Sequence, residues 1–450
     1  MKRFVRTWRY WVMGSDWKEV SLGEIGRVVT GKTPKTKVIE NFGHEIPFIT
    51  PRDMDDQRII SETERYLSKV GSVSVKNSII PANSISVSCI GSDMGKSAIT
   101  KYLSVTNQQI NSIVVSDEFY YKFVYYNLSS RKAEIRGLAG GSAQPILNKS
   151  DFSQIKMFVP PLTEQKAIAY ILGSLDDKIE LNRQMNETLE AMAQALFKSW
   201  FVDFDPVIDN ALAAGNAIPD EFVERAEQRK GIEKKDHSDT QNLFPDEFEF
   251  SEEMGWIPRG WMVESFGDVS ICFDRLRIPL SKKQRESKKP GVIPYHGATS
   301  VMDYINEWIL DDIYLLIGED GSVIKEDGSP FVQYIWGKTW VNNHAHVLQG
   351  KNGVGTEHLM LFMQSQNLTA YITGAVQLKI NQGNMNRIPF LNSGSKINEK
   401  FTAIINPYYE KVRITAEENE TLVKLRDTLL PKLMSGELRI TDAEALVENV

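Results

Sequence analysis

The chain contains Asn186-Glu187-Thr188-Leu189 and repeats these four residues as Asn419-Glu420-Thr421-Leu422, an offset of 233 (419 minus 186). At the same offset, Lys178-Ile179 matches Lys411-Val412 and Asn148 matches Asn381. Apolar positions also match in pairs, namely Ile168 with Phe401, Ile171 with Ile404, Leu172 with Ile405, Leu189 with Leu422, Met192 with Leu425 and Leu196 with Leu429. One offset shared by so many positions indicates an internally duplicated chain.

The segments preceding these motifs are duplicated more loosely. Residues 17–25 (WKEVSLGEI) open the first copy, and residues 261–269 (WMVESFGDV) open the second. Each copy has short β-branched runs between glycine, proline and asparagine signals, such as Ser84–Ile90, Ser112–Val115 and Tyr314–Ile317. Such runs predict strands. We therefore expect an α/β (α+β) fold in which a globular unit, a helical unit and their repeats alternate.

The helical parts carry recognisable start and stop signals. Thr163 is placed to cap a helix over 164–172, and Gly173-Ser174 predicts a break, after which Ser174 would cap a longer helix. In the second copy, Asn406 is the expected cap and Pro407 the first helical residue. A helix of roughly 26 residues would span about 39 Å.

These helices carry an apolar stripe with a heptad-like spacing, which calls for a partner helix. Its members, including one polar position per helix, are Ile168, Leu175, Asn182, Leu189 and Leu196 in the first copy and Phe401, Tyr408, Thr415, Leu422 and Leu429 in the second. We predict that the two helices pack against each other; the alternative is that each stripe packs on its own globular unit.

The distribution of charge permits DNA binding although the net charge is −7. Residues 17–160 carry 18 basic and 14 acidic side chains, residues 256–392 carry 13 of each, and residues 202–255 carry 5 and 15. The acidity is therefore confined to a middle segment. The two distant cysteines fit a reducing cytoplasm. The basic, aromatic start, residues 1–14, is a poor signal peptide and is expected to be an extension or a short nucleic-acid-binding arm.

The chain shows several incomplete catalytic motifs. Gly91–Ser97 has three residues between its glycines where a phosphate loop has four. Asn406-Pro407-Tyr408-Tyr409 is similar to an adenine methyltransferase motif but lacks its second proline. His344 and His346 have no third ligand at a useful spacing. We expect no catalytic residue, no metal site and no cofactor on this chain.

Several longer motifs resemble those of the specificity subunit of Type I restriction–modification systems. Residues 159–168 (VPPLTEQKAI) and 175–179 (LDDKI) are similar to the start of that family's central helix, and 195–204 (ALFKSWFVDF) to its end. Residues 242–248 (NLFPDEF), 257–261 (IPRGW) and 430–438 (LPKLMSGEL) match further family segments. The second copy departs from the pattern, with Leu391-Asn392-Ser393 in place of Pro160-Pro161-Leu162.

The resemblance implies the following domain organisation: an N-terminal extension (1–16), target recognition domain 1 (17–160), a central helical region (161–204), an acidic linker (205–255), target recognition domain 2 (256–392), a distal helical region (393–440) and a tail (441–450). It also implies that the helices form an antiparallel coiled coil with a pseudo-twofold relation. Each recognition domain would read one half of a bipartite target in double-stranded DNA.

The resemblance further implies the partners. Two modification subunits would dock on the helical regions and methylate adenine with S-adenosylmethionine, and restriction subunits would cleave with ATP and Mg²⁺. Lysine and arginine in loops are the side chains expected to hold phosphates and read bases. The candidates for DNA contact are Lys32, Lys35, Arg52, Lys96, Lys101, Arg275, Arg277, Lys282, Lys283, Arg285 and Lys338. Two rival interpretations are an assembly protein without a DNA role and a nuclease that acts alone.

Overall fold

The computed structural model describes residues 16–54, 58–138, 146–231, 238–374 and 377–447. Most of the predicted N-terminal extension therefore lies outside the described residues. The chain divides into two compact units, the first formed by residues 1–181 and 418–450 and the second by 182–417. Both boundaries fall within long helices, so each unit contains a globular head and a segment of both helices. This division differs from the predicted order of domains, which kept each helix whole.

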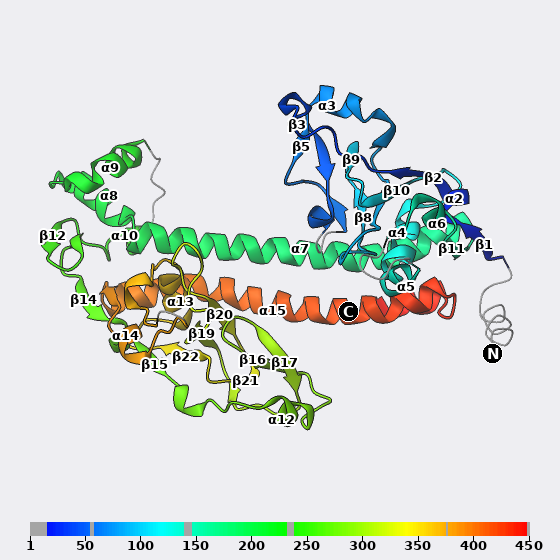
Figure 1. The fold of residues 1–450 in the computed structure, drawn as a ribbon. Helices are drawn as coiled ribbons and strands as arrows, with labels where there is room; N and C mark the ends of the chain where they lie inside the picture. Colours follow the sequence, from blue (N-terminus) through cyan, green and yellow to red (C-terminus); the bar gives the residue numbers. More distant parts are fainter. Residues whose placement is uncertain (1–15, 55–57, 139–145, 232–237, 375–376, 448–450) are drawn as a thin grey trace. The chain divides into compact units, whose positions relative to one another are not determined.

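The head of the first unit is built on two sheets (Figure 1). One sheet has the order β2-β10-β7-β8-β4, with strands Gly26–Thr30, Ile110–Val115, Ile85–Ser88, Ser97–Thr100 and Ile59–Ile60. The other has the order β5-β3-β9-β6, with strands Tyr66–Leu67, Phe42–Ile49, Ser104–Thr106 and Ile79–Ile80. The strands predicted around Ser84–Ile90 and Ser112–Val115 are confirmed as β7 and β10.

Short helices complete this head. They are α2 (Leu22–Ile25), α3 (Lys69–Ser74), α4 (Tyr121–Ser129), α5 (Lys132–Gly137) and α6 (Lys149–Ser153). The chain enters and leaves the head through an antiparallel strand pair, β1 (Lys18–Ser21) and β11 (Lys156–Val159). The last helix, α16 (Ile440–Val447), contributes Ala443 to the core of the same unit.

The head of the second unit repeats this plan. Its sheets have the orders β15-β22-β19-β20 (Ser270–Cys272, Ala345–Gly350, Tyr314–Gly318, Val332–Ile335) and β17-β16-β21-β18 (Val301–Ile305, Ile293–His296, Lys338–Val341, Leu310–Asp311). The chain enters and leaves this head through the antiparallel strand pair β14 (Met262–Ser265) and β23 (Pro389–Asn392). Its helices are α11 (Phe266–Val269), α12 (Lys282–Glu286), α13 (Thr356–Gln364) and α14 (Gln382–Asn386).

Specific contacts show that the heads are true repeats. Asn148 and Asn381 each cap a short helix by accepting a hydrogen bond from the backbone N–H three residues on, at 2.9 and 2.8 Å. Ser21 and Ser265 each form a capping box, with Glu24 and Asp268 respectively. In both heads, a parallel strand pair joins the second sheet, β3 with β9 and β16 with β21. The asparagine match at the common offset is therefore a repeated helix cap.

The two long helices are continuous, α7 over Leu162–Phe201 and α15 over Ser395–Met434, each of 40 residues. The predicted break at Gly173-Ser174 is wrong. The flanking Leu172 and Leu175 are fully buried, and Ser174 bonds to the Ile171 carbonyl at 2.8 Å rather than capping a new helix. Burial of two leucines outweighs the cost of about 1 kcal/mol for glycine in a helix.

The predicted helix start at Asn406-Pro407 is also wrong, because Pro407 lies inside α15. Proline in a helix interior costs about 3 kcal/mol or more. Ile405 and Tyr409, on either side of it, are buried in the core of the second unit and hold the helix together across this position. The actual start, Ser395, lies at the common offset from Leu162, so the missing Pro-Pro-Leu segment leaves the helix start unchanged.

Within each unit the segments of α7 and α15 run antiparallel and pack side by side (Figure 1). In the second unit, Asn186 lies opposite Val412 and Phe197 opposite Phe401. In the first unit, Ile179 lies opposite Asn419 and Asp176 opposite Arg426. The predicted pairing of the helices as an antiparallel coiled coil is confirmed.

The predicted acidic linker is folded over most of its length. It contains α8 (Asp205–Ala214), α9 (Val223–Lys230), α10 (Ser238–Gln241) and the strand pair β12 (Phe248–Ser251) and β13 (Gly255–Pro258). Two of its acidic side chains are neutralised internally, since Arg225 bonds to both carboxylate oxygens of Asp205 at 2.8 Å and Arg229 pairs with Asp209. Burial tends to raise the pKa of Asp205, but hydrogen bonds from Arg225 and Ser199 and the positive charge of Arg229 hold this pKa below its ordinary value.

Candidate nucleic-acid interface

In the first unit, four of the five predicted DNA contacts are exposed on loops or turns. Lys32 and Lys35 follow β2, Arg52 lies in the turn η2 (Pro51–Met54), and Lys101 follows β8. Lys101 extends over the ring of Tyr102, with its ammonium 5.4 Å from the ring centroid. The fifth, Lys96, is half-buried and pairs with Asp93 at 2.8 Å, so it holds the loop between β7 and β8 together.

In the second unit, the predicted contacts separate into two groups. Arg275, Lys282, Lys283 and Lys338 are exposed, and the ammonium of Lys338 lies 4.0 Å from the ring centroid of Trp308. Arg277 and Arg285 have side chains only 13% and 16% exposed, and both are used inside the protein. A side chain that is already bonded internally is poorly placed to read a base.

Arg277 is the centre of a network that fixes the loops at the end of the β15-β22-β19-β20 sheet. Its guanidinium donates to Glu319 at 2.6 Å and to the Ala345 carbonyl at 2.7 Å, and it pairs with Asp274 at 3.2 Å. Arg285 has a similar role elsewhere, since it bonds to Asp303 and to the Leu280 carbonyl. Both arginines therefore position loops.

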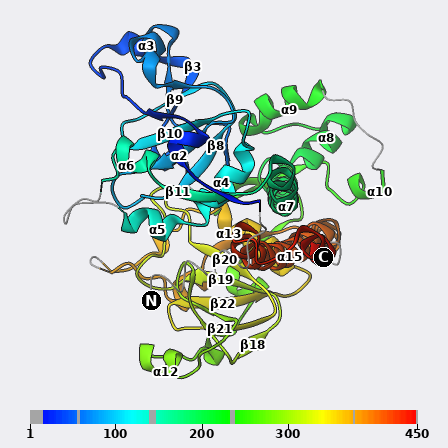
Figure 2. The same cartoon turned by 90° about the vertical axis from the view of Figure 1, so that its right-hand side faces the viewer.

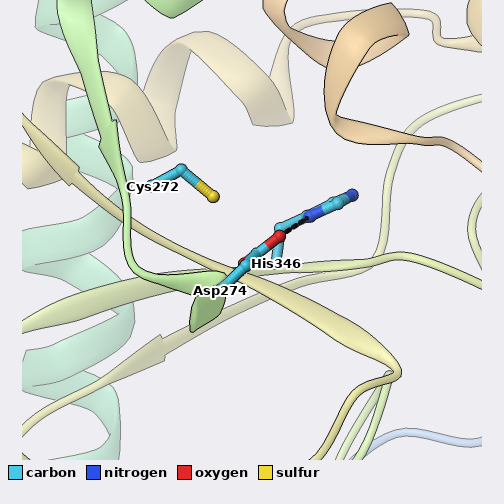
Figure 3. A group of neighbouring side chains, drawn as sticks. All are labelled: Cys272, Asp274 and His346. Carbon is cyan, nitrogen blue, oxygen red and sulfur yellow. Dashed lines mark hydrogen bonds and ion pairs between the residues drawn. The ribbon is translucent and has the colours of Figure 1, made fainter. Parts of the chain in front are cut away.

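His346 joins this network, together with Asp274 and Cys272 (Figure 3). The Nδ1 atom of His346 lies 2.6 Å from the Asp274 carboxylate, and its Nε2 atom lies 3.0 Å from the Ile380 carbonyl. Hydrogen bonds from His346 and from the Val347 backbone hold the pKa of Asp274 below its ordinary value, although burial opposes this. Burial also raises the pKa of the Cys272 thiol to about 12.

The three side chains have ligand atoms within 4.8 Å of one another, the kind of grouping that can hold a metal ion. A structural hydrogen-bonded cluster fits these residues better than a metal site does. Asp274 already faces the cationic Arg277, and both ring nitrogens of His346 face acceptors. Sequence reasoning considered His346 only with His344 and missed Asp274 and Cys272, which lie more than 70 positions earlier. The absence of a metal site stays a prediction.

A hollow of about 380 Å³, with polar and apolar residues in its lining, lies in the second head. Two segments beside it carry exposed polar side chains, Thr299 and Ser300 on one and Gln377 on the other, whereas His344 already pairs with Asp320 at 2.5 Å. The backbone positions of the loops are fixed by the bonds from Glu319 N–H to the His344 carbonyl and from Ile380 N–H to the Glu319 carbonyl, at 2.8 and 2.9 Å. Side chains of this kind can read base edges. Sequence reasoning missed them because it ranked charged residues first.

The predicted coiled-coil residues are buried or half-buried. Seven are buried, namely Ile168, Leu175, Asn182, Phe401, Thr415, Leu422 and Leu429, and Leu189, Leu196 and Tyr408 are half-buried. Asn186 and Asn419, from the repeated tetrapeptide, make the same contact. Asn186 donates to the Val412 carbonyl at 3.3 Å, and Asn419 donates to the Ile179 carbonyl at 3.2 Å. The repeated tetrapeptide of each helix thus contacts the repeated Lys-Ile or Lys-Val pair of the facing helix.

Comparison with known proteins identifies the family. The family model of the Type I restriction modification DNA specificity domain matches residues 14–191 and 258–424, which is more than half of the chain. The chain therefore belongs to this family, and the resemblance seen in its motifs is confirmed. In the described residues, no helix is both long and apolar enough to cross a membrane.

The chain is similar to specificity subunits over nearly its whole length. It is 28% identical to the Type I restriction enzyme MjaIX specificity subunit of Methanocaldococcus jannaschii, over 95% of this chain and 94% of that one. It is 24% identical to the HindI specificity subunit of Haemophilus influenzae, over 94% and 100%. The crystal structure of the S subunit from M. genitalium shares the fold, with a TM-score of 0.55, 16% identity and coverage of 93% and 96%.

Proposed function

We propose that this chain is the non-catalytic specificity subunit of a Type I restriction–modification enzyme and reads a bipartite DNA target. The observation that carries the proposal is the duplication, in which two heads of the same plan each stand on segments of two paired 40-residue helices. Two heads joined by stiff helices suit two separated half-sites on one duplex. The exposed loop lysines and arginines would supply phosphate contacts, and Thr299, Ser300 and Gln377 beside the hollow of the second head would supply base contacts.

The partners follow from the family. Two modification subunits would bind the helical segments and methylate adenine in each half-site, and restriction subunits would translocate and cleave the DNA. S-adenosylmethionine, ATP and Mg²⁺ would bind to those subunits rather than to this chain. Such a complex would act in the cytoplasm, where the DNA is.

The test is a map of adenine methylation at single-base resolution. The chain is expressed with its neighbouring modification subunit in a strain that lacks other systems of this kind. We expect a new bipartite motif with a fixed gap. A stable purified complex that leaves the genome unmethylated would favour the alternative, an assembly protein without DNA reading, and turnover of DNA by the chain alone would favour a nuclease.

A further inference from the structure

The distal lobe of the first unit carries exposed apolar and basic side chains together. This lobe consists of residues 32–49 and 66–80 and includes β3, β5, β6, α3, η1 (Ile39–Asn41) and η3 (Lys76–Ser78). Figures 1 and 2 both show α3 and β3 at the end of the head away from β11. Building on the proposed function, we propose that this lobe clamps DNA, inserting Ile39, Val70 and Val73 into the minor groove between lysine–phosphate contacts.

The lobe is rigidly built. Gly71 of α3 packs so closely on η1 that a Cβ atom there would lie 1.9 Å from the Asn41 carbonyl oxygen. Ser68 caps α3 and its backbone N–H bonds to the same carbonyl at 3.0 Å. The buried Asn41 donates to the Lys35 carbonyl at 3.0 Å, which ties the preceding loop to the same point. The surface that η1 and α3 present is therefore preorganised.

The apolar side chains on this surface are strongly exposed although the lobe has a closed core of its own. Ile39 is 81% exposed, Val73 66% and Val70 65%. The core beneath them is formed by Phe48, Leu67, Val75 and Val105, all buried. Apolar groups left in water on a rigid surface indicate a binding site. Proteins that bind the minor groove commonly insert such side chains between base steps.

The charge of the lobe favours a polyanion such as DNA as its binding partner. Its five lysines, Lys32, Lys35, Lys37, Lys69 and Lys76, are all exposed, and the lobe has only two carboxylates, Glu40 and Glu45. Within the described part of the chain, none of the five forms an ion pair. This surface is basic in a protein whose net charge is −7, so DNA complements it better than an average protein surface does.

The matching lobe of the second unit provides an internal contrast. It also carries basic residues, on and after α12; Lys282 and Lys283 are exposed, but the three that follow them are paired. Arg285 and Lys289 both pair with Asp303 at 3.1 Å, and Lys288 pairs with Glu307 at 2.5 Å. Lysines that are already paired contribute less to the salt dependence of DNA binding than free ones. The second lobe therefore supplies control substitutions of the same chemical type.

The first experiment measures how target-DNA affinity depends on salt, using the full chain in complex with its modification subunit and a duplex carrying the mapped motif. Each phosphate contact contributes about 0.9 to the slope of log K against log salt. We expect the double variant Lys69→Gln/Lys76→Gln to lower the slope by about 2, and Lys288→Gln/Lys289→Gln to leave it nearly unchanged. An unchanged slope in the first variant would overturn the clamp.

The second experiment tests insertion. 2-Aminopurine is placed in turn along the first half-site, where unstacking raises its fluorescence. We expect one step to brighten on binding, and the variant Ile39→Ser/Val70→Ser/Val73→Ser to abolish the brightening while the salt slope stays the same. If this variant instead weakens binding of the modification subunit, the patch is a protein-docking surface and the proposal fails. A wild-type complex that binds no target DNA would count against the proposed function itself.

Discussion

Besides apolar packing, the first unit joins its head to the helices through a half-buried carboxylate, and the second does so through aromatic rings. In the first unit, Asp176 of α7 accepts hydrogen bonds from Tyr126 of the head at 2.6 Å and from Arg426 of α15 at 2.9 Å. In the second, Phe201 of α7 and Phe401 of α15 surround His358 of the head, with ring centroids 4.6 and 4.8 Å from the imidazole. The same architecture therefore rests on different chemistry.

The second unit also has a tyrosine–carboxylate–arginine group, but at positions unrelated by the repeat. Tyr334 donates to Glu357 at 2.6 Å, and Arg413 of α15 pairs with the same carboxylate at 3.4 Å. The residue at the common offset from Asp176 is Tyr409. The duplication has thus kept backbone positions, helix caps and the asparagine contacts, while the contacts between head and helix have changed independently.

If the second unit depends on its aromatic rings, Phe401→Ala should have the largest effect. Removing a fully buried phenylalanine costs about 3–5 kcal/mol, and this ring contacts Phe197, Trp200 and Phe201. Urea unfolding followed by tryptophan emission measures the loss, because Trp200 and Trp261 lie in this core. The matched control is Ile414→Ala on the same helix, which is 52% exposed and should change stability little.

If the first unit depends on its carboxylate, Asp176→Ala should destabilise it by about 3 kcal/mol, because Arg58 and Arg426 would be left without their shared partner. The side chains of Asp176 and Arg58 are only 12% and 15% exposed. Hydrogen exchange should speed up in α4 and the start of α7 while α13 stays protected. Asp177→Ala, at a neighbouring carboxylate that is 63% exposed, should have a much smaller effect. Equal effects of the two would contradict the comparison.

The aromatic site predicts a pH dependence that is specific to the second unit. Complete burial lowers the pKa of His358 from 6.5 to about 3, and among the residues that the structure describes its Nδ1 atom has no hydrogen-bond partner. The imidazole therefore stays neutral in the folded protein but is protonated below pH 6.5 in the unfolded chain, so stability falls as the pH falls. Between pH 7 and pH 5 the loss should be about 2 kcal/mol. His358→Leu should remove this part of the pH dependence measured by urea unfolding.

The sequence predicted what the duplication preserves. The repeated motifs located the two heads, and the heptad-like stripe predicted the pairing of the helices. The sequence matched Asn148 with Asn381, but only the structure shows that both residues are helix caps. The sequence could not show that α7 continues through Gly173 or that α15 continues through Pro407. Local signals favour a break at both positions, and only the burial of neighbours such as Leu175 and Tyr409 in tertiary contacts reverses that preference.

The predicted DNA contacts stay predictions, but the sequence could not show which of these residues are buried, for a related reason. Arg277 and Lys32 look alike in sequence, yet the first is surrounded by Asp274 and Glu319 and the second is exposed. Whether a basic residue is free depends on carboxylates that are distant in sequence. Lys69 and Lys76 of the distal lobe, which were not among the predicted contacts, could have been found from the stretch 66–80, which has two lysines and no acidic residue.

The smallest expected effect is at the contact that both units share. Asn186 and Asn419 each donate to a carbonyl of the facing helix, so removing either should cost about 1 kcal/mol. Each contact also joins its own unit only, so Asn186→Ala should speed hydrogen exchange around Val412, and Asn419→Ala around Ile179. The two effects should be similar and should add in the double variant, since each contact lies within its own unit. An effect at one site only would show that the repeated motif has kept its role in a single unit, although both copies keep its sequence.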